Sequence, residues 1–227
     1  MVITLTTIIT SNYAASVSMT LFPLPYLPPV SWCAAAWHQD RIVVEAREHY
    51  QKGSLRNRCH IAGPNGVQRL SIPLVKGKHR QTPIREVRIS YDDPWQRQHW
   101  RSICTAYGNA PFFEHYAGGL APFYERRYEF LFDFNLDLLA FIFQKKLGWP
   151  GTITLSDTYF PAGAWSHGAD LRAAFEAEPA NWPEWLRPAH YPQVFAERHG
   201  FLPNLSVLDL LFCSGKRGGE VLAGSTV

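Results

Sequence analysis

Two short apolar runs on either side of an alanine-rich segment begin the patterned part of the chain. Residues 21–24 are apolar, residues 30–37 are rich in alanine, and Ile42-Val43-Val44 is β-branched. This order predicts a strand, a helix and a second strand, because alanine favours helices and β-branched residues favour strands. Such a βαβ unit predicts parallel strands, with functional loops at their carboxyl ends.

A hairpin pattern follows. Strand-like residues 57–61 and 67–74 flank Pro64-Asn65-Gly66. Asn-Gly between two such runs is the strongest short-range hairpin signal. Residues 84–89 alternate in polarity and predict one further strand.

The second half of the chain has helical spacing. Apolar or aromatic residues recur every four positions from Trp95 to Tyr107, after an Asp93-Pro94 start signal. The longest helical pattern covers residues 126–147, before Gly148 and Pro150, and carries one polar stripe of Glu129, Asp133, Asp137 and Gln144. Residues 170–177 and 205–213 are two further predicted helices.

These elements predict a single α/β domain: a mixed sheet with an N-terminal βαβ unit, a β-hairpin insertion and flanking helices. We expect this domain to cover residues 19–214. No charged residue occurs before Asp40. The first 18 residues are too interrupted by polar residues for a membrane span and lack the basic start of a secretory signal, so we expect an unstructured extension before a native start at Met19. Residues 215–227 are rich in glycine and small residues and predict a flexible tail.

Composition narrows the class of protein. The chain has 227 residues, 46% of them hydrophobic and 18% charged, which is typical of an ordinary globular protein. Its four cysteines are widely spaced and form no CxxC pair, which argues against a zinc ribbon and favours reduced thiols in the cytoplasm. The net charge of +3 is too small to imply nucleic acid by itself.

The motifs of common cofactors and hydrolases are absent from the sequence. It contains no GxGxxG, GxxxxGK[ST], GxSxG or HExxH pattern. Asp133, Asn135 and Asp137 imitate the front of a calcium loop, but the required glycine is missing and the segment is helical. We therefore predict no metal site, and the sequence indicates no particular cofactor.

Basic residues are concentrated in one part of the chain. Nine basic residues and one acidic residue lie between Lys52 and Arg88. Guanidinium and ammonium groups bind phosphate or carboxylate, so Lys52, Arg56 and Arg58 are candidate anion ligands. The alternative is that the hairpin carries basic residues outward for solubility. RNA binding is a weaker alternative, because aromatic residues are not interleaved with the basic ones.

Other polar residues are candidates for chemistry. Gln51 and Asn57 can each donate and accept hydrogen bonds, as recognition of sugar hydroxyls requires, although asparagine also serves turns. Asp209 is isolated among apolar residues, so it is either paired with a basic residue or a site carboxylate with a raised pKa. Asn204 is either a helix cap or a ligand. His115 is either a general base or a structural histidine.

Several segments, in order, resemble one family. They are Tyr26-Leu27-Pro28-Pro29, Tyr50-Gln51-Lys52 with Asn57-Arg58, residues 70–73, Trp95 with His99, Tyr107 with Ala110-Pro111-Phe112-Phe113, Asn135, Tyr191-Pro192-Gln193-Val194-Phe195 and residues 201–212. Together they resemble the WbqC-like protein family, over about residues 21–215. The resemblance implies a bacterial, cytosolic protein connected with surface polysaccharides such as O-antigen. Members have been proposed to add aminoacyl or acyl groups to amino sugars, and many carry an Asp pair where this chain has Glu45 and Ala46.

The basic segment and the resemblance lead to one functional hypothesis. We expect an enzyme that transfers an aminoacyl or acyl group to an amino sugar, with a nucleotide sugar or sugar phosphate as its anionic ligand. The expected ligand-binding residues are Tyr26, Gln51, Lys52, Arg56, Asn57, Arg58, Asn135 and Asn204. Asp209 or His115 would accept the proton of the acceptor amine. The alternative is a non-catalytic protein that binds an anionic metabolite.

Overall fold

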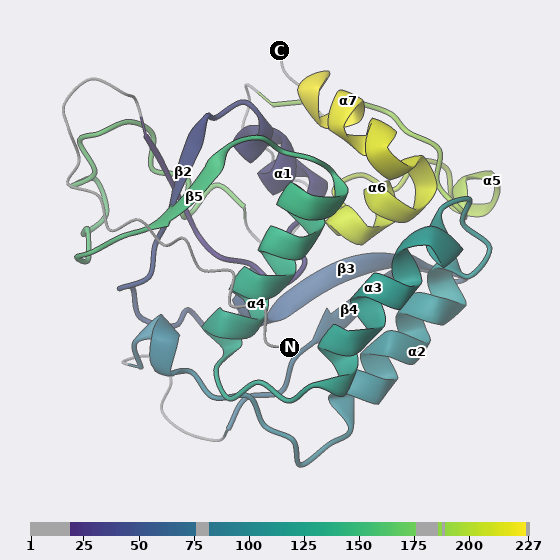
Figure 1. The fold of residues 1–227 in the computed structure, drawn as a ribbon, viewed down its shortest axis with the longest axis horizontal. Coiled ribbons are helices and arrows are strands. Elements are labelled where there is room, and N and C mark those ends of the chain that lie inside the picture. The colour runs from purple at the N-terminus through teal and green to yellow at the C-terminus, as the bar shows by residue number, and fades with distance from the viewer. Residues whose placement is uncertain (1–18, 76–81, 176–185, 188, 226–227) are drawn as a thin grey trace.

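The predicted βαβ unit forms one side of the molecule (Figure 1). The computed structural model describes residues 19–75, 82–175, 186–187 and 189–225, so the predictions for residues 1–18 lie outside the described residues. Strands β1 (Thr20–Phe22), β2 (Arg41–Val44) and β5 (Thr152–Leu155) form a parallel sheet in the order β1-β2-β5. Helix α1 (Val30–Trp37) connects β1 to β2. The α/β prediction is confirmed.

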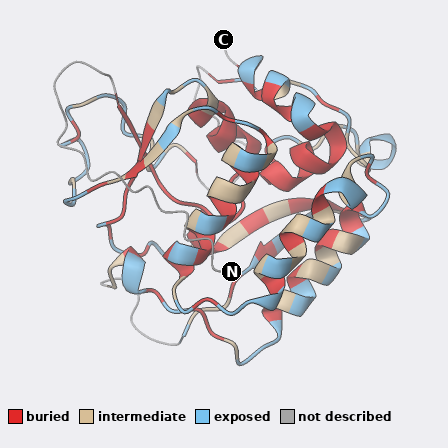
Figure 2. Ribbon diagram, viewed as in Figure 1, coloured by how far each residue is buried: buried red, intermediate tan, exposed pale blue. Residues whose placement is uncertain are grey.

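Strand β2 is buried on both faces of the sheet. Ile42 and Val44 point into the main hydrophobic core, whereas Val43 joins a small cluster with Leu21 and Trp165 on the other face. A central parallel strand needs apolar residues on both faces, which explains the uninterrupted β-branched run. Helix α1 covers the core side and is itself almost completely buried (Figure 2).

The predicted hairpin is also confirmed. Strands β3 (Arg58–Gly63) and β4 (Gly66–Ser71) pair antiparallel, and Gly66 takes the positive φ of +100° that the turn requires. Helices α2 (Trp95–Tyr107) and α3 (Phe113–Glu125) lie side by side, and α2 packs on β3 (Figure 1). The helix predicted from Trp95 is therefore correct.

The predicted helix over residues 126–147 is wrong at its beginning. Helix α4 covers only Leu131–Leu139 and continues as the π-helical segment η4 (Ala140–Lys146). Residues 126–130 are extended instead, because their backbone pairs with the segment that precedes α2. The amide of Ile89 donates to the carbonyl of Glu129, and the amide of Leu131 donates to that of Val87.

The predicted strand over residues 84–89 forms only in part, as isolated bridges in its second half. Its first half is the short 3-10 helix η3 (Ile84–Glu86), after Pro83. Its second half makes isolated bridges, Leu74 to Ile89 and Arg88 to Phe130. A second 3-10 helix, η1 (Leu55–Asn57), precedes β3.

The helix predicted at residues 170–177 does not form in its described part. The backbone there pairs with the edge of β1, since the amide of Leu171 donates to the carbonyl of Leu21. Residues 176 and 177 lie outside the described part. Tertiary pairing has thus replaced a weak helical preference.

The C-terminal residues form helices, in contrast to the expected flexible tail. After α5 (Ala196–His199), helix α6 (Val207–Ser214) begins at Ser206, whose hydroxyl accepts from the amide of Leu208. It is followed by η5 (Gly215–Arg217) and α7 (Gly218–Ala223). Helix α7 packs on α1, where a Cβ on Gly219 would lie 2.7 Å from the ring of Trp37. Glycine therefore allows close packing at a site where its flexibility suggested a loose end.

Candidate functional site

The carboxyl ends of the parallel strands bring charged side chains together. Glu45 directly follows β2 and Ser156 directly follows β5. One oxygen of Glu45 accepts from the Ser156 hydroxyl at 2.6 Å, and the other accepts from Nη1 of Arg172 at 3.1 Å. Glu45 has no exposed surface, so these bonds compensate a buried carboxylate.

Arg172 links this carboxylate to a second one. Its Nε and Nη2 donate to the two oxygens of Asp170 at 2.9 and 2.6 Å. Partial burial would raise the pKa of Asp170, but the hydrogen bonds from Arg172 outweigh it and hold that pKa below its ordinary value. The pair raises the pKa of Arg172 in turn.

A second ion pair lies in the loop after β2. Nε and Nη2 of Arg56 each donate to one oxygen of Glu48 at 2.6 Å, and both side chains are only 4% exposed. A guanidinium that is buried and bidentate to a carboxylate is not available to an anionic ligand. The anion-binding role predicted for Arg56 is therefore corrected to a structural one.

Three other predicted ligands also support the loop. Asn57 accepts from the hydroxyl of Tyr50 and donates to the carbonyl of Ile72, and Asn135 donates to the carbonyl of Arg56 at 2.7 Å. The backbone amide of Tyr26 donates to the carbonyl of Leu55, while its hydroxyl is buried in the core. These contacts give the three residues a scaffolding role around residues 50–58.

The remaining predicted residues of this loop face solvent. Gln51 and Lys52 are exposed, and Arg58 is half-buried with Nη1 3.4 Å from the carbonyl of Gly53. Burial raises the pKa of Tyr50 and the charge of Arg58 opposes that rise, which places this guanidinium near the phenol. The basic end of the loop is therefore accessible to a ligand.

His49 connects the loop to the charged cluster. It is exposed, and its ring lies 6.5 Å from that of Tyr159, over which the guanidinium of Arg172 stacks at 5.9 Å. We call this group the sheet-edge site. It consists of Glu45, His49, Ser156, Tyr159, Asp170 and Arg172. The accessible loop residues Gln51, Lys52 and Arg58 follow His49 in the chain.

The other predicted residues lie apart from this site. Asp209 is fully buried on α6 and accepts from the hydroxyl of Tyr191 at 2.8 Å and the amide of Gln193 at 2.9 Å. Neither partner is basic, so the predicted pairing with arginine or lysine is wrong. Burial raises the pKa of Asp209 to about 6, although hydrogen bonds from these two residues and from Tyr107 oppose the shift.

Two further predicted residues, His115 and Asn204, also lie apart from the sheet-edge site. His115 is exposed on α3, with its ring 4.6 Å from that of Tyr116. Asn204 lies before α6, but its oxygen accepts from the amide of Ser31 at 3.0 Å and so caps the N-terminus of α1. Of the two alternatives for Asn204, the structure shows the helix cap, on a helix 173 residues earlier in the chain.

The sequence analysis did not identify the charged network of Glu45, Asp170 and Arg172 in the sheet-edge site. Glu45 had a readable signal, because it directly follows a buried strand in a predicted βαβ unit. Asp170 and Arg172 had none, since their segment was read as a helix. Within residues 19–75, 82–175 and the described C-terminal part, no group of three histidine, cysteine, aspartate or glutamate side chains could hold a metal ion. In the same residues, no helix is long and apolar enough to cross a membrane.

Comparison with known proteins identifies the family. The model of the WbqC-like protein family matches residues 25–179. The chain belongs to the WbqC-like protein family. That match includes the whole sheet-edge site, whereas Asp209 lies beyond its end.

One similar protein is the uncharacterized protein Rv1507c of Mycobacterium tuberculosis. It is 36% identical over 86 residues, which is 37% of this WbqC-like chain and 36% of Rv1507c. The aligned stretch thus spans about a third of that relative. No solved structure matches the chain.

Proposed function

We propose that this WbqC-like protein is a cytoplasmic enzyme of glycan biosynthesis, which transfers an aminoacyl or acyl group to an amino sugar. The observation that supports the proposal is the sheet-edge site, where basic and acidic side chains meet at the carboxyl ends of parallel strands. Ligands of open α/β sheets bind at that edge. An acceptor that carries both an amine and a phosphate needs both signs of charge.

Lys52 and Arg58 are the proposed anion ligands. Lys52 is exposed and Arg58 is half-exposed, and Arg58 can present two parallel N–H groups to a phosphate. Gln51, exposed beside them, can donate to and accept from sugar hydroxyls.

His49 is the proposed proton acceptor, in place of His115 or Asp209. In the proposed reaction, the sugar amine attacks the carbonyl carbon of an activated ester or thioester. The C–N bond forms, the bond from carbon to the leaving group breaks, and His49 takes the proton of the amine. The partly exposed carboxylate of Asp170 would attract the amine as an ammonium ion, which loses one proton to solvent before the neutral amine attacks. His49 takes the second proton as the C–N bond forms and passes it to the leaving group.

A non-catalytic binding protein is the second candidate. The observation that favours it is the complete pairing of Arg172, whose nitrogens already bond Asp170, Glu45 and the carbonyl of Phe160. Such a saturated network suits a rigid receptor as well as an enzyme.

A thermal-shift screen tests the anion site. Nucleotide sugars, sugar phosphates and acyl or aminoacyl donors are the ligands, with Lys52→Ala and Arg58→Ala as variants. Arg69→Ala is the control, because Arg69 is exposed on the hairpin strand β4. A ligand at about 100 times its Kd adds roughly 2.7 kcal/mol, which for this size raises Tm by about 5 to 11 °C.

The outcomes separate the two candidates. We expect a shift that both site variants lose and Arg69→Ala retains, followed by a product in mass spectrometry that His49→Gln does not form. Saturable binding without product from any donor would favour the receptor. A shift that Arg58→Ala and Lys52→Ala leave intact would refute the site.

A further inference from the structure

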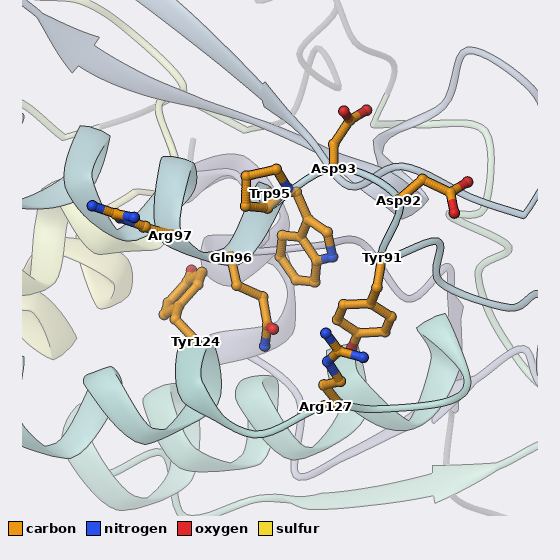
Figure 3. Close-up of a pocket in the computed structure, with 9 residues that line it drawn as sticks. Tyr91, Asp92, Asp93, Trp95, Gln96, Arg97, Tyr124 and Arg127 are labelled. Carbon is orange, nitrogen blue, oxygen red and sulfur yellow. The ribbon is translucent and has the colours of Figure 1, made fainter.

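A separate pocket lies where α2 begins, between α2 and the end of α3. Its volume is about 300 Å³, which is sufficient for a small organic molecule. Its walls include Tyr91, Trp95, Gln96, Tyr124 and Arg127 (Figure 3). None of these residues belongs to the sheet-edge site.

The indole of Trp95 points an unsatisfied donor to this pocket. Trp95 is 2% exposed, and its ring packs against His99 at 5.1 Å and Phe134 at 5.7 Å between ring centroids. Its Nε1 has no hydrogen-bond partner among the described residues. In Figure 3 this nitrogen lies on the side of Tyr91 and Arg127. An indole N–H only donates, so the position requires an acceptor oxygen.

Arg127 supplies a positive charge on the same side. Its guanidinium stacks over the ring of Tyr91 at 4.9 Å, and it forms no ion pair with any carboxylate of the described residues. Gln96 lies beside the two groups in Figure 3, and its amide nitrogen donates to the carbonyl of Arg126 at 2.6 Å. One cation therefore lies at the surface of the hollow, and one buried neutral donor lies in its aromatic wall.

We propose that this pocket binds a small monocarboxylate with a flat, ring-containing body. One carboxylate oxygen would accept from Nε1 of Trp95 and the other from Arg127, while Tyr91 and Tyr124 contact the ring. Asp92 and Asp93 line the rim and point outward in Figure 3. Their negative charges repel a doubly charged phosphate more strongly than a singly charged carboxylate. The proposed ligand is therefore a monocarboxylate and not a phosphate monoester.

Access to the nitrogen depends on the mouth of the pocket. Nε1 has almost no direct contact with solvent, so an acceptor reaches it only when a side chain at the mouth turns aside. Arg127 is exposed, and within the part of the chain that the structure describes its guanidinium is held only by stacking on the half-buried ring of Tyr91, which is a weak interaction. The same movement would bring its charge onto the carboxylate.

Calorimetric titration with benzoate tests the proposal. We expect saturable binding to the full chain, weakened roughly tenfold or more by Trp95→Phe, which keeps an aromatic ring, although a smaller one, and removes the N–H donor. Arg127→Gln should weaken binding to a similar degree. Arg126→Gln is the matched control, because Arg126 stacks over Tyr128 at 4.6 Å and does not line the pocket. Phenyl phosphate should bind more weakly than benzoate.

Each contrary outcome overturns a defined part of the proposal. Absence of saturable benzoate binding, or unchanged affinity in a folded Trp95→Phe variant, overturns the site. Tighter binding of phenyl phosphate overturns the ligand class. If Trp95→Phe does not fold, the surface variant Arg127→Gln decides alone, and unchanged affinity there refutes the proposal. Arg58→Ala should bind benzoate normally, so the result is independent of the proposed anion site.

Discussion

The hydroxyl of Tyr26 lies 3.1 Å from Nδ1 of His99, deep in the core. The imidazole also bonds the backbone of Ser71, whose carbonyl can only accept, so the ring hydrogen belongs on the other nitrogen. Nδ1 is then the acceptor of the Tyr26 hydroxyl. That hydroxyl is also 2.9 Å from the hydroxyl of Tyr124. The three side chains form a buried polar chain that holds α2 and α3 to the loop after β1.

Acidification should destabilise the folded protein through His99, because the buried imidazole resists protonation. Burial lowers its pKa to about 4 from an ordinary value of 6.5. The unfolded chain therefore takes up a proton first, and His99 removes stability as pH falls from 6.5 to 4, by up to about 3 kcal/mol. Urea denaturation between pH 7 and 4 measures this effect. The free energy of unfolding of the wild type should exceed that of His99→Gln by less at pH 4 than at pH 7. The control is His115→Gln, at an exposed position of α3.

Asp209 should have the opposite pH dependence. Its folded pKa of about 6 exceeds the ordinary 3.8, so its contribution to stability is complete below pH 3.8 and is lost as pH rises to 6. The advantage of wild type over Asp209→Asn should decrease by about 3 kcal/mol between pH 4 and 7. The comparison variant is Glu114→Gln, at an exposed position of α3. A pH-independent effect of Asp209→Asn would contradict the assignment.

Breaking the buried ion pair should be costly. Arg56→Ala leaves the carboxylate of Glu48 buried without its partner, and we expect a loss of about 3 to 5 kcal/mol in the free energy of unfolding. The exposed pair Arg88–Glu129 is the matched comparison, and Arg88→Ala should cost less than about 1 kcal/mol. Equal costs in chemical denaturation would show that burial does not govern the Glu48–Arg56 pair.

Asn204 should combine two separable effects. It caps α1 through the amide of Ser31 and has a positive φ of +59°. Asn204→Gly keeps the backbone conformation and loses the cap, which should lower the free energy of unfolding by about 1 kcal/mol. Asn204→Ala loses the cap as well and adds about 1 kcal/mol of backbone strain. Thermal unfolding of the three proteins measures both steps. A glycine variant less stable than the alanine variant would disprove this division.

The parts of the fold that local pattern determines were predictable. The β-branched run of β2 and the Asn65-Gly66 turn each carry their own signal, and both elements formed as expected. Residues 126–130 were misread, because their backbone partners, Val87 and Ile89, lie about 40 residues away and leave no local trace.

In the candidate site too, features with a local sequence signal were predictable and features that depend on distant partners were not. The loop residues Lys52 and Arg58 could be found from charge alone. The partner of Arg56 could not, because Glu48 lies eight residues earlier in an irregular loop where no periodicity sets spacing. Asp209 was correctly identified as an unusual buried carboxylate, yet its partners Tyr191 and Gln193 are neutral hydrogen-bond donors that charge arithmetic does not reveal.

The cap on α1 has a consequence for how the protein is made. Ser31 and Asn204 are 173 residues apart, and β2 acquires its second neighbour only when β5 has been synthesised. On the ribosome, the βαβ unit therefore emerges with an open strand edge and an uncapped helix, and it stays incomplete for most of translation. Nascent chains halted between residues 179 and 204 should be more easily degraded by proteases than the released protein, although they contain every residue that the family model matches.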